Sequence, residues 1–234
     1  MKTITKKELA KILVKHKKWR DEFGEGEIAD FSYVDLSGAD LRMANLRYAN
    51  FSGANLCGAD LSNSNLRYGN LSNIDFSNAN LSDADLSEAW FNNANLSGAD
   101  LSDADMRGAI FSNANLSYAN LRGAIFSNAN LSGAILSNAN FRGAVGNMCE
   151  VKSLSLDNYS VTYTSEVLQI GCECHLISDW WTFDDKAISK MDSDALAWWV
   201  RYKEFIKMAI EISPAVPTGH ETSLRPATFE EYRI

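Results

Sequence analysis

The sequence has little of what enzymes and membrane proteins usually need. Its 234 residues include only three histidines, and no apolar run approaches the length of about 18 residues that a membrane-spanning helix requires. His16, His175 and His220 belong to no recognisable catalytic triad or metal-binding motif. The lysine-rich amino terminus lacks the continuous apolar stretch of a secretory signal. We therefore expect a protein that is not an enzyme, has no membrane partner and is located in the cytoplasm.

Cysteine is also scarce. Cys57, Cys149, Cys172 and Cys174 are irregularly spaced, which suits a reducing compartment better than a disulfide framework. The last three of these cysteines and His175 would be enough ligands for zinc, but one residue between Cys172 and Cys174 is not the usual ligand spacing. Free thiols explain these cysteines better. The sequence thus predicts no bound metal and no cofactor.

The chain lacks the excess of basic side chains that nucleic-acid-binding proteins carry. Its net charge is -8, and acidic residues outnumber basic ones everywhere except at the amino terminus. Residues 1–28 contain 8 basic and 5 acidic side chains, residues 29–145 contain 6 and 11, and residues 146–234 contain 8 and 14. Direct binding to duplex DNA or to anionic lipid is therefore not expected.

What the chain does contain is a repeat of five residues. From Phe31 to Phe141, each of the 23 positions five apart is Leu, Phe or Met, and the residue two positions earlier is Ala in 19 of them. A period of five fits neither a helix nor a flat strand. It fits a chain that turns a corner every five residues, so that four units close one square coil of 20 residues. The large residue and the Ala then point inward, and the other three positions point outward.

This pattern resembles that of the pentapeptide-repeat family, as in the run Ala79-Asn80-Leu81-Ser82-Asp83-Ala84-Asp85-Leu86. The resemblance covers about half of the chain. It implies an all-β solenoid, a right-handed quadrilateral β-helix over residues 29–145. With a strand spacing of about 4.8 Å, some six coils would make a rod of roughly 28 Å.

The segments on either side of the repeat read as caps for the open ends of the solenoid. Residues 1–28 predict an α-helical cap that begins with a capping box, Thr5 and Glu8. Residues 146–213 predict a small α+β module, with strands over 151–170 around a turn at Asp157-Asn158, then helices over 182–191 and 193–212. Residues 214–234 contain all three prolines and predict a loose tail.

The last predicted helix is amphipathic and rich in aromatic residues. Trp198, Trp199 and Tyr202 lie on its apolar face, which we expect to pack mostly on the last coil. The alternative is a contact between two copies of the chain, a homodimer through the carboxy-terminal module. The segment from Gly171 to Ile212 also resembles a module attached to pentapeptide repeats in some phage-encoded proteins, which would place the protein in the host cytoplasm.

Because residues 20 apart should stack, the outside of the rod can be mapped from the sequence. Two coils then bring together an acidic corner, beside which Trp90 should stack on Ile110 at positions that are usually polar. An exposed Trp next to Ile and bordered by carboxylates is a candidate binding hot spot, and the alternative is a solvated acidic face. The carboxylates are those of Asp83, Asp85, Glu88, Asp100, Asp103 and Asp105.

A second patch lies toward the amino-terminal end of the repeat. Arg47 should stack on Arg67 and Tyr48 on Tyr68, with Arg42 around the corner. Arginine interleaved with tyrosine could hold a phosphate or an unstacked base. The alternative is a solvated ladder of polar side chains.

Two functions follow from this surface. The first is a non-enzymatic adaptor or inhibitor that presents a rigid surface to a protein partner, such as a DNA-binding enzyme. The alternative comes from the family resemblance, since members that protect topoisomerases from quinolones are acidic DNA mimics. Such a mimic would occupy the DNA-binding site of a topoisomerase or of a host defence nuclease. The repeat itself counts against mimicry, because its net charge is only -5 and it contains six arginines.

Overall fold

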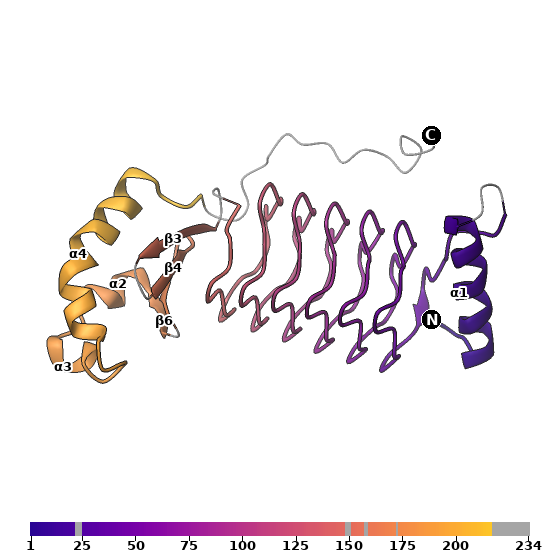
Figure 1. The fold of residues 1–234 in the computed structure, drawn as a ribbon, viewed down its shortest axis with the longest axis horizontal. Helices are drawn as coiled ribbons and strands as arrows, with labels where there is room; N and C mark the ends of the chain where they lie inside the picture. Colours follow the sequence, from indigo (N-terminus) through magenta and orange to yellow (C-terminus); the bar gives the residue numbers. More distant parts are fainter. Residues whose placement is uncertain (22–24, 148–150, 157–158, 172, 217–234) are drawn as a thin grey trace.

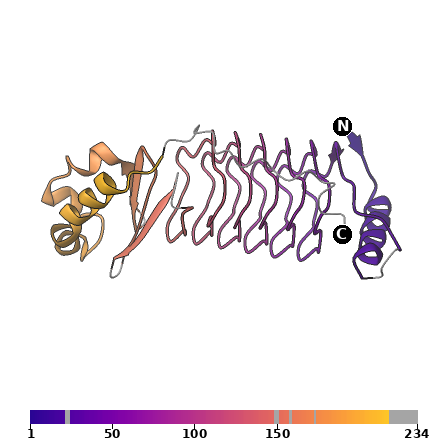
Figure 2. The ribbon, with the colours of Figure 1, turned by 90° about the horizontal axis from the view of Figure 1, so that it is seen from above.

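The structure, a computed structural model, describes residues 1–21, 25–147, 151–156, 159–171 and 173–216. The repeat forms a rod of stacked coils with a helix at its amino-terminal end and a small α/β module at the other (Figures 1 and 2). The elements are β1 (Lys2–Thr3), α1 (Lys6–Asp21), β2 (Val34–Asp35), β3 (Lys152–Leu156), β4 (Tyr159–Tyr163), β5 (Val167–Ile170), β6 (Glu173–Leu176), α2 (Ile177–Trp180), α3 (Asp185–Ile188) and α4 (Ala195–Ile212).

Each coil of the rod is held to the next by backbone hydrogen bonds between residues about 20 apart. The Leu81 N–H donates to the Asp100 carbonyl at 2.7 Å, and the Asp100 N–H donates to the Ala79 carbonyl at 2.9 Å. The same parallel pairing recurs from Asp30 to Val145. The predicted coil of 20 residues is therefore confirmed.

The corners of the coil depend on one backbone conformation. The second residue after each large apolar residue has a positive φ in most units, for example 57° at Asn93 and 70° at Gly123. Gly and Asn adopt this left-handed region at little cost. Tyr48, Tyr68 and Glu88 adopt it as well, with φ between 59° and 64°. Their side chains consequently project from a corner of the rod.

The interior of the rod contains the large residue of each unit and the small residue, usually Ala, two positions before it, as predicted. Phenylalanines on neighbouring coils stack, with the Phe91 and Phe111 rings 4.6 Å apart and 9° from parallel. Both side chains are fully buried. Because every coil contributes to one continuous core, a cavity in one coil removes contacts from the coils on both sides.

We predict that Phe91→Ala lowers the free energy of unfolding by about 3–5 kcal/mol, because it removes buried apolar surface and leaves a cavity. Urea denaturation followed by circular dichroism measures this change. Ser112→Ala, on the outside of the neighbouring coil, is the matched control and should change the stability by less than about 0.5 kcal/mol. Equal losses in the two variants would contradict the described packing.

The amino-terminal end of the rod is covered by α1. The capping box is confirmed, since the Thr5 N–H donates to Glu8 Oε2 at 2.7 Å and the Glu8 N–H donates to Thr5 Oγ1 at 3.2 Å. Leu9, Ile12 and Leu13 pack against the core of the first coil. β1 pairs in parallel with β2 and so extends the sheet at this end.

A buried histidine ties α1 to the first coil. His16 Nδ1 accepts a hydrogen bond from the Ala29 N–H at 3.1 Å, and the His16 ring stacks on Trp19 at 5.5 Å. The pKa of His16 is lowered because burial disfavours the charged imidazole, and the Arg20 guanidinium adds to this effect. A protonated Nδ1 could not accept the bond, so the neutral ring is the form that holds the cap.

This histidine predicts a pH dependence. The unfolded chain protonates His16 near pH 6.5, while the folded chain resists protonation, so the free energy of unfolding should decrease as the pH falls from about 6.5 to 5. His16→Gln should lose this component of the dependence. The protection of the Ala29 amide against hydrogen exchange, corrected for its intrinsic rate, reports the same event locally. An Ala29 protection factor that is constant over this range would contradict the assignment.

The carboxy-terminal module is built on an antiparallel sheet of four strands in the order β3-β4-β5-β6. Strand alternation gives the sheet two different faces. Val161, Tyr163, Leu168 and Ile170 belong to a core shared with the helices, whereas Gln169 is buried against the last coil. The Phe141 N–H donates to Gln169 Oε1 at 2.6 Å. A buried side-chain amide thus occupies the place of the next coil's carbonyl at the open edge of the solenoid.

Several predictions for this module were wrong. The predicted helix over 182–191 is only the single turn of α3, and β6 and α2 were not predicted. The predicted helix over 193–212 corresponds to α4, but α4 packs on the sheet and not on the last coil, because the sheet lies between them (Figure 1). The predicted turn at Asp157-Asn158 lies outside the described residues, and so do residues 217–234 of the predicted tail.

Two of the three residues predicted for a homodimer contact, Trp198 and Trp199, are buried within the module. Trp198 and Trp199 are only 8% and 4% exposed in a single copy of the chain. They pack within the module together with Tyr202, whose ring lies 5.1 Å from that of Trp198. Side chains that are already buried by their own domain offer a second copy almost no surface, whereas Tyr202 is half-buried, so a homodimer through this module stays a prediction.

Candidate functional site

The predicted stacking of the acidic corner is confirmed by the backbone pairing. Asp85 pairs with Asp105 across neighbouring coils. Asp83 and Asp103 are exposed at the corner immediately before these residues, with φ of 56° and 58°. The two coils thus present carboxylates side by side, at about the strand spacing of 4.8 Å.

Three of the six predicted carboxylates stabilise turns of the backbone. Asp85, Asp100 and Asp105 each accept a hydrogen bond from the backbone N–H two residues later, at 3.0 to 3.1 Å. Asp100 also accepts from Ser102 Oγ at 2.7 Å and from Asn120 Nδ2 at 2.9 Å. These are Asx-type turns, which hold the chain at the point where it enters the corner. Asp100 lies on the preceding face of the rod, three residues before the corner residue Asp103.

Arginines neutralise part of the remaining charge. The guanidinium of Arg107 lies 2.5 Å from Asp105 and that of Arg122 lies 3.4 Å from Asp103. The hydrogen bond from Arg107 lowers the pKa of Asp105. Within the described residues, Asp83 and Glu88 are the two carboxylates of the group that are exposed and form neither an ion pair nor an Asx turn. The acidic corner is therefore interrupted by positive charge.

The predicted pair of Trp90 and Ile110 exists, but it is less exposed than predicted. The two residues pair across neighbouring coils, and both side chains are half-buried. They lie in one column with Asn70 and Asn130, next to the corner that carries Glu88. A flat apolar strip borders the acidic residues here, in place of a projecting tryptophan.

The predicted stacking of the arginine and tyrosine residues is also confirmed. The rings of Tyr48 and Tyr68 are stacked at 5.0 Å. Arg47 and Arg67 lie over the rings of the tyrosines that follow them, at 5.6 and 4.8 Å from the ring centroids. The Nε atoms of both arginines are buried and have no hydrogen-bond partner among the described residues. Trp19 of α1 extends the stack with an edge contact to Tyr48 at 5.9 Å.

Arg42 does not belong to this patch. Its guanidinium is 2.7 Å from Asp40 and 3.8 Å from Asp60, both on its own face. The hydrogen bonds from Arg42 lower the pKa of Asp40 to about 2. An arginine held between two carboxylates has less capacity to bind a phosphate, so Arg42 is not counted with Arg47 and Arg67 below.

The sequence indicated two separate patches, but the structure joins them on one face of the rod. This face consists of the units 44–48, 64–68, 84–88, 104–108 and 124–128, together with the corner residues Asp83 and Asp103 at its border. Where the patches meet, Asn65 Nδ2 donates to Asp85 Oδ2 at 3.2 Å, and the Tyr68 N–H donates to the Ser87 carbonyl at 3.2 Å. We call this surface the bipolar face, with Arg47, Tyr48, Arg67 and Tyr68 as its basic half and Asp83, Asp85, Glu88, Asp103 and Asp105 as its acidic half.

The prediction missed residues at both ends of the bipolar face. Trp19 reaches it from α1, which stacking of residues 20 apart could not show. Ile125 and Val145 continue the column of Asp85 and Asp105 toward the carboxy-terminal end, and this continuation is visible in the sequence at a spacing of 20. Val145 is 46% exposed. The face thus runs from basic and aromatic through acidic to apolar.

Comparison with protein families agrees with the geometry. The family model for pentapeptide repeats matches residues 29–63, 59–98, 91–128 and 124–147, in eight copies. These matches span about half of the chain. The chain belongs to the pentapeptide-repeat family. Proteins of this family fold as right-handed quadrilateral β-helices and are in general structural or binding proteins rather than enzymes.

Solved structures of the family resemble parts of the chain. A pentapeptide-repeat protein of the Arabidopsis thaliana thylakoid lumen is 34% identical over 40% of this chain and 65% of its own, with a TM-score of 0.39. HetL from Nostoc, involved in the regulation of heterocyst differentiation, is 32% identical over 52% and 71%, with a TM-score of 0.22. QnrB1, a plasmid-mediated fluoroquinolone resistance protein, is 24% identical over 47% and 65%, with a TM-score of 0.29.

The chain spans less than two thirds of the thylakoid protein and of QnrB1. No curated protein matches it. Because all three TM-scores are below 0.5, these structures support no conclusion about the function of this chain.

The described residues contain neither a metal-ligand cluster nor a helix long and apolar enough to span a bilayer. Cys57 and Cys174 are free thiols. Of the four candidate zinc ligands, Cys149 and Cys172 lie outside the described residues, and Cys174 and His175 lie within them. The resemblance of residues 171–212 to a phage module stays a prediction, since the family match ends at residue 147.

The two kinds of carboxylate predict different effects of mutation. Asp100→Ala should lower the free energy of unfolding by about 1–3 kcal/mol, because the turn loses its hydrogen bonds to a charged acceptor. Asp100→Asn should retain most of the stability, since the amide oxygen can still accept, as it does at many units. Asp83→Ala, at the neighbouring exposed corner, is the matched comparison and should cost less than Asp100→Ala. Urea denaturation of the three variants measures this, and the reverse order would contradict the assignment.

Proposed function

We propose that this protein is a non-enzymatic adaptor or inhibitor that binds a protein partner through the bipolar face. The observation that supports the proposal is the joining of the basic and acidic halves on one rigid face. A partner with a matching arrangement of charges would be recognised and oriented by it, because complementary charges fix register as well as attraction. The proposal draws on the geometry of this chain and not on the function of any relative.

Rigidity suits this role. The face is carried by backbone hydrogen bonds of 2.7 to 3.2 Å between successive coils, and its tyrosines are stacked on each other. A surface that is ordered before binding loses little conformational entropy when a partner docks. The tyrosines and arginines are also the residue types that contribute most to binding energy at protein interfaces.

The guanidinium groups of the basic half suggest what it binds. Arg47 and Arg67 are half-buried and form no ion pair among the described residues. A carboxylate that reaches the exposed part of these groups would form hydrogen bonds between charged partners, which are stronger than neutral ones. We therefore expect acidic side chains of the partner to contact the basic half, and basic side chains to contact Asp83 and Glu88.

DNA mimicry fits this face less well. A duplex presents one negative charge per about 1.7 Å of its axis, without interruption. Here the acidic half spans only two coils, and the basic half lies next to it. Two of its carboxylates are paired with arginines, Asp105 with Arg107 and Asp103 with Arg122. A DNA-binding groove that accepts phosphates would meet guanidinium groups over part of the rod.

A capture experiment with matched variants tests the proposal. The basic-half variant is Arg47→Gln with Arg67→Gln, and the acidic-half variant is Asp83→Asn with Glu88→Gln. The control is Glu204→Gln with Lys207→Gln on the exposed surface of α4. Each purified protein is immobilised, exposed to a bacterial lysate and eluted with increasing salt, and bound proteins are identified by mass spectrometry.

We expect the unmodified chain and the control variant to retain one and the same protein from the lysate. Each of the two face variants should bind this protein at least tenfold more weakly. A DNA-handling enzyme that is lost only with the acidic-half variant would instead establish mimicry. A partner that both face variants retain fully would contradict the proposed interface.

A further inference from the structure

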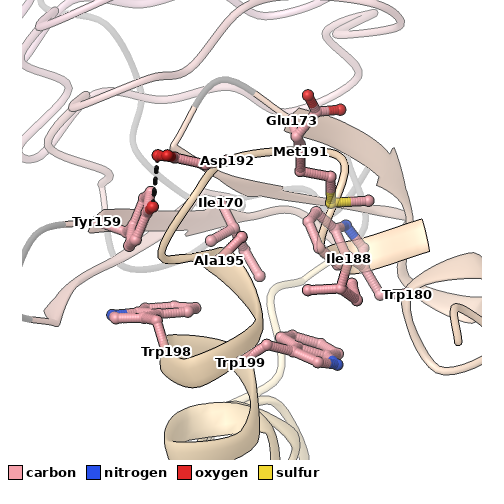
Figure 3. A pocket seen from close by; sticks show the side chains of 10 residues that line it. All are labelled: Tyr159, Ile170, Glu173, Trp180, Ile188, Met191, Asp192, Ala195, Trp198 and Trp199. Carbon is pink, nitrogen blue, oxygen red and sulfur yellow. Dashed lines mark hydrogen bonds between the residues drawn. The ribbon is translucent and has the colours of Figure 1, made fainter. Parts of the chain in front are cut away.

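The carboxy-terminal module contains a cavity that the bipolar face does not involve. It lies between the sheet and the start of α4 and measures about 40 Å³ (Figure 3). Four of its ten lining residues are aromatic, with Tyr159 and Trp198 on one side and Trp180 on the other, and four more are aliphatic. The tryptophans and the sheet form one core, so the cavity is part of a folded domain and not a gap between two units.

The aromatic walls are fixed in place. Trp180 Nε1 donates to the Leu168 carbonyl at 2.6 Å, and Trp198 Nε1 donates to the Leu156 carbonyl at 3.0 Å. The N–H group of each indole thus donates its hydrogen bond to a backbone carbonyl, and the apolar surface of the ring lines the cavity. The rings of Tyr159 and Trp198 meet at 67° with their centroids 5.0 Å apart, which makes two walls of a cage.

A glycine allows this arrangement. Gly171 follows β5 and has a φ of 60°. A Cβ atom at this position would approach the ring of Tyr159 to 2.9 Å, which is closer than such atoms pack. The ring therefore lies directly against the glycine backbone, and any side chain at residue 171 would displace it.

Two carboxylates stand at the rim of the cavity, Glu173 of β6 and Asp192 before α4 (Figure 3). Asp192 Oδ2 accepts a hydrogen bond from the Tyr159 hydroxyl at 2.6 Å. This bond, with others from Ser193, lowers the pKa of Asp192 and keeps it charged. Glu173 lies 3.3 Å from His175 Nε2, a contact that is an ion pair only when the imidazole is protonated. The surrounding segment, residues 173–194, carries six acidic and two basic side chains.

The size of the cavity limits what it can hold. Its volume is the space open to the centre of a water molecule, so adding the water radius of about 1.4 Å gives a rounded space of about 3.5 Å radius. This is enough for one methylated ammonium group and too small for most cofactors. Aromatic faces attract such cations, and carboxylates at the rim supply the matching charge.

We propose that this cavity is an aromatic cage that binds a methylated ammonium group, of the kind found in trimethyllysine or in small quaternary ammonium compounds. An unmethylated ammonium fits less well, because it is strongly hydrated and needs hydrogen-bond acceptors that the apolar walls do not provide. A neutral group of the same shape would gain apolar contact with the rings but not the electrostatic attraction to the rings and the carboxylates.

Titration with matched probes tests the cage. The probes are blocked trimethyllysine, its neutral carbon isostere with a tert-butyl group, blocked lysine, and the tetramethylammonium ion alone. Binding to the full chain is followed by isothermal titration calorimetry, and by the indole N–H signals of Trp180, Trp198 and Trp199 in nuclear magnetic resonance spectra. We expect trimethyllysine to bind at least about tenfold more tightly than either its isostere or lysine.

Variants locate the site. Glu173→Gln with Asp192→Asn should weaken trimethyllysine binding about tenfold or more, whereas Glu204→Gln, an exposed carboxylate on α4, should leave it unchanged. Ala195→Leu places a larger side chain in the cavity and should abolish binding. If that variant does not fold, the carboxylate variant and the indole signals still decide the question.

Several results would overturn the cage. Equal binding of trimethyllysine and its isostere would show a plain apolar pocket, and equal binding of lysine would show attraction to surface charge alone. Absence of binding, or full binding by Ala195→Leu, would also refute it. If the cage exists, tight binding of tetramethylammonium alone indicates a free small cation, and a requirement for the lysine chain indicates a methylated protein. Loss of the bipolar-face interaction would leave these results unaffected, so the two proposals can fail separately.

Discussion

The structure depends on hydrogen bonding between backbone groups 20 residues apart. Each coil supplies the donors and acceptors that the next coil needs, and the corner that makes this possible requires a left-handed residue in nearly every unit. The side chains that face outward and form no Asx turn are then free to vary, because they contribute little to the coil itself. For this reason a solenoid can carry arginines, tyrosines and carboxylates in ordered columns without loss of its core.

The same requirement creates a problem at both ends, where backbone groups have no further coil to bind. The amino-terminal end is closed by β1 and by α1, with the buried His16 accepting from the backbone of the first coil. The carboxy-terminal end is closed by a sheet whose inner face carries a buried glutamine, Gln169, that bonds both Phe141 and Asn140. In both places a polar side chain accepts the backbone hydrogen bond that a further coil would accept, and apolar side chains of the cap pack behind it.

The sequence was sufficient to predict the coil, its interior and the stacking of residues 20 apart, because all three follow from one strict period. It did not separate the roles of the carboxylates, since Asp85 and Asp83 are both aspartates at polar, outward positions. Only the structure shows that Asp85 holds an Asx turn while Asp83 is exposed at a corner. It also placed the aromatic face of α4 against the rod, because nothing in a single segment shows that β6 and α2 complete a separate core. Trp19 was missed for a similar reason, since its contact with Tyr48 joins two elements with different periods.

Crosslinking in living cells tests the central claim, the binding of a protein at the bipolar face, most directly. A photoreactive phenylalanine is introduced at Asn63, an exposed corner residue beside Asp83, or at Asn78, an exposed corner residue of the unit on the opposite face. Both positions have a positive φ that Tyr48 and Tyr68 adopt elsewhere in the rod, so an aromatic side chain should be accepted. The account predicts a crosslinked protein from residue 63 and none from residue 78. Equal crosslinking from both positions, or none from residue 63, would contradict it.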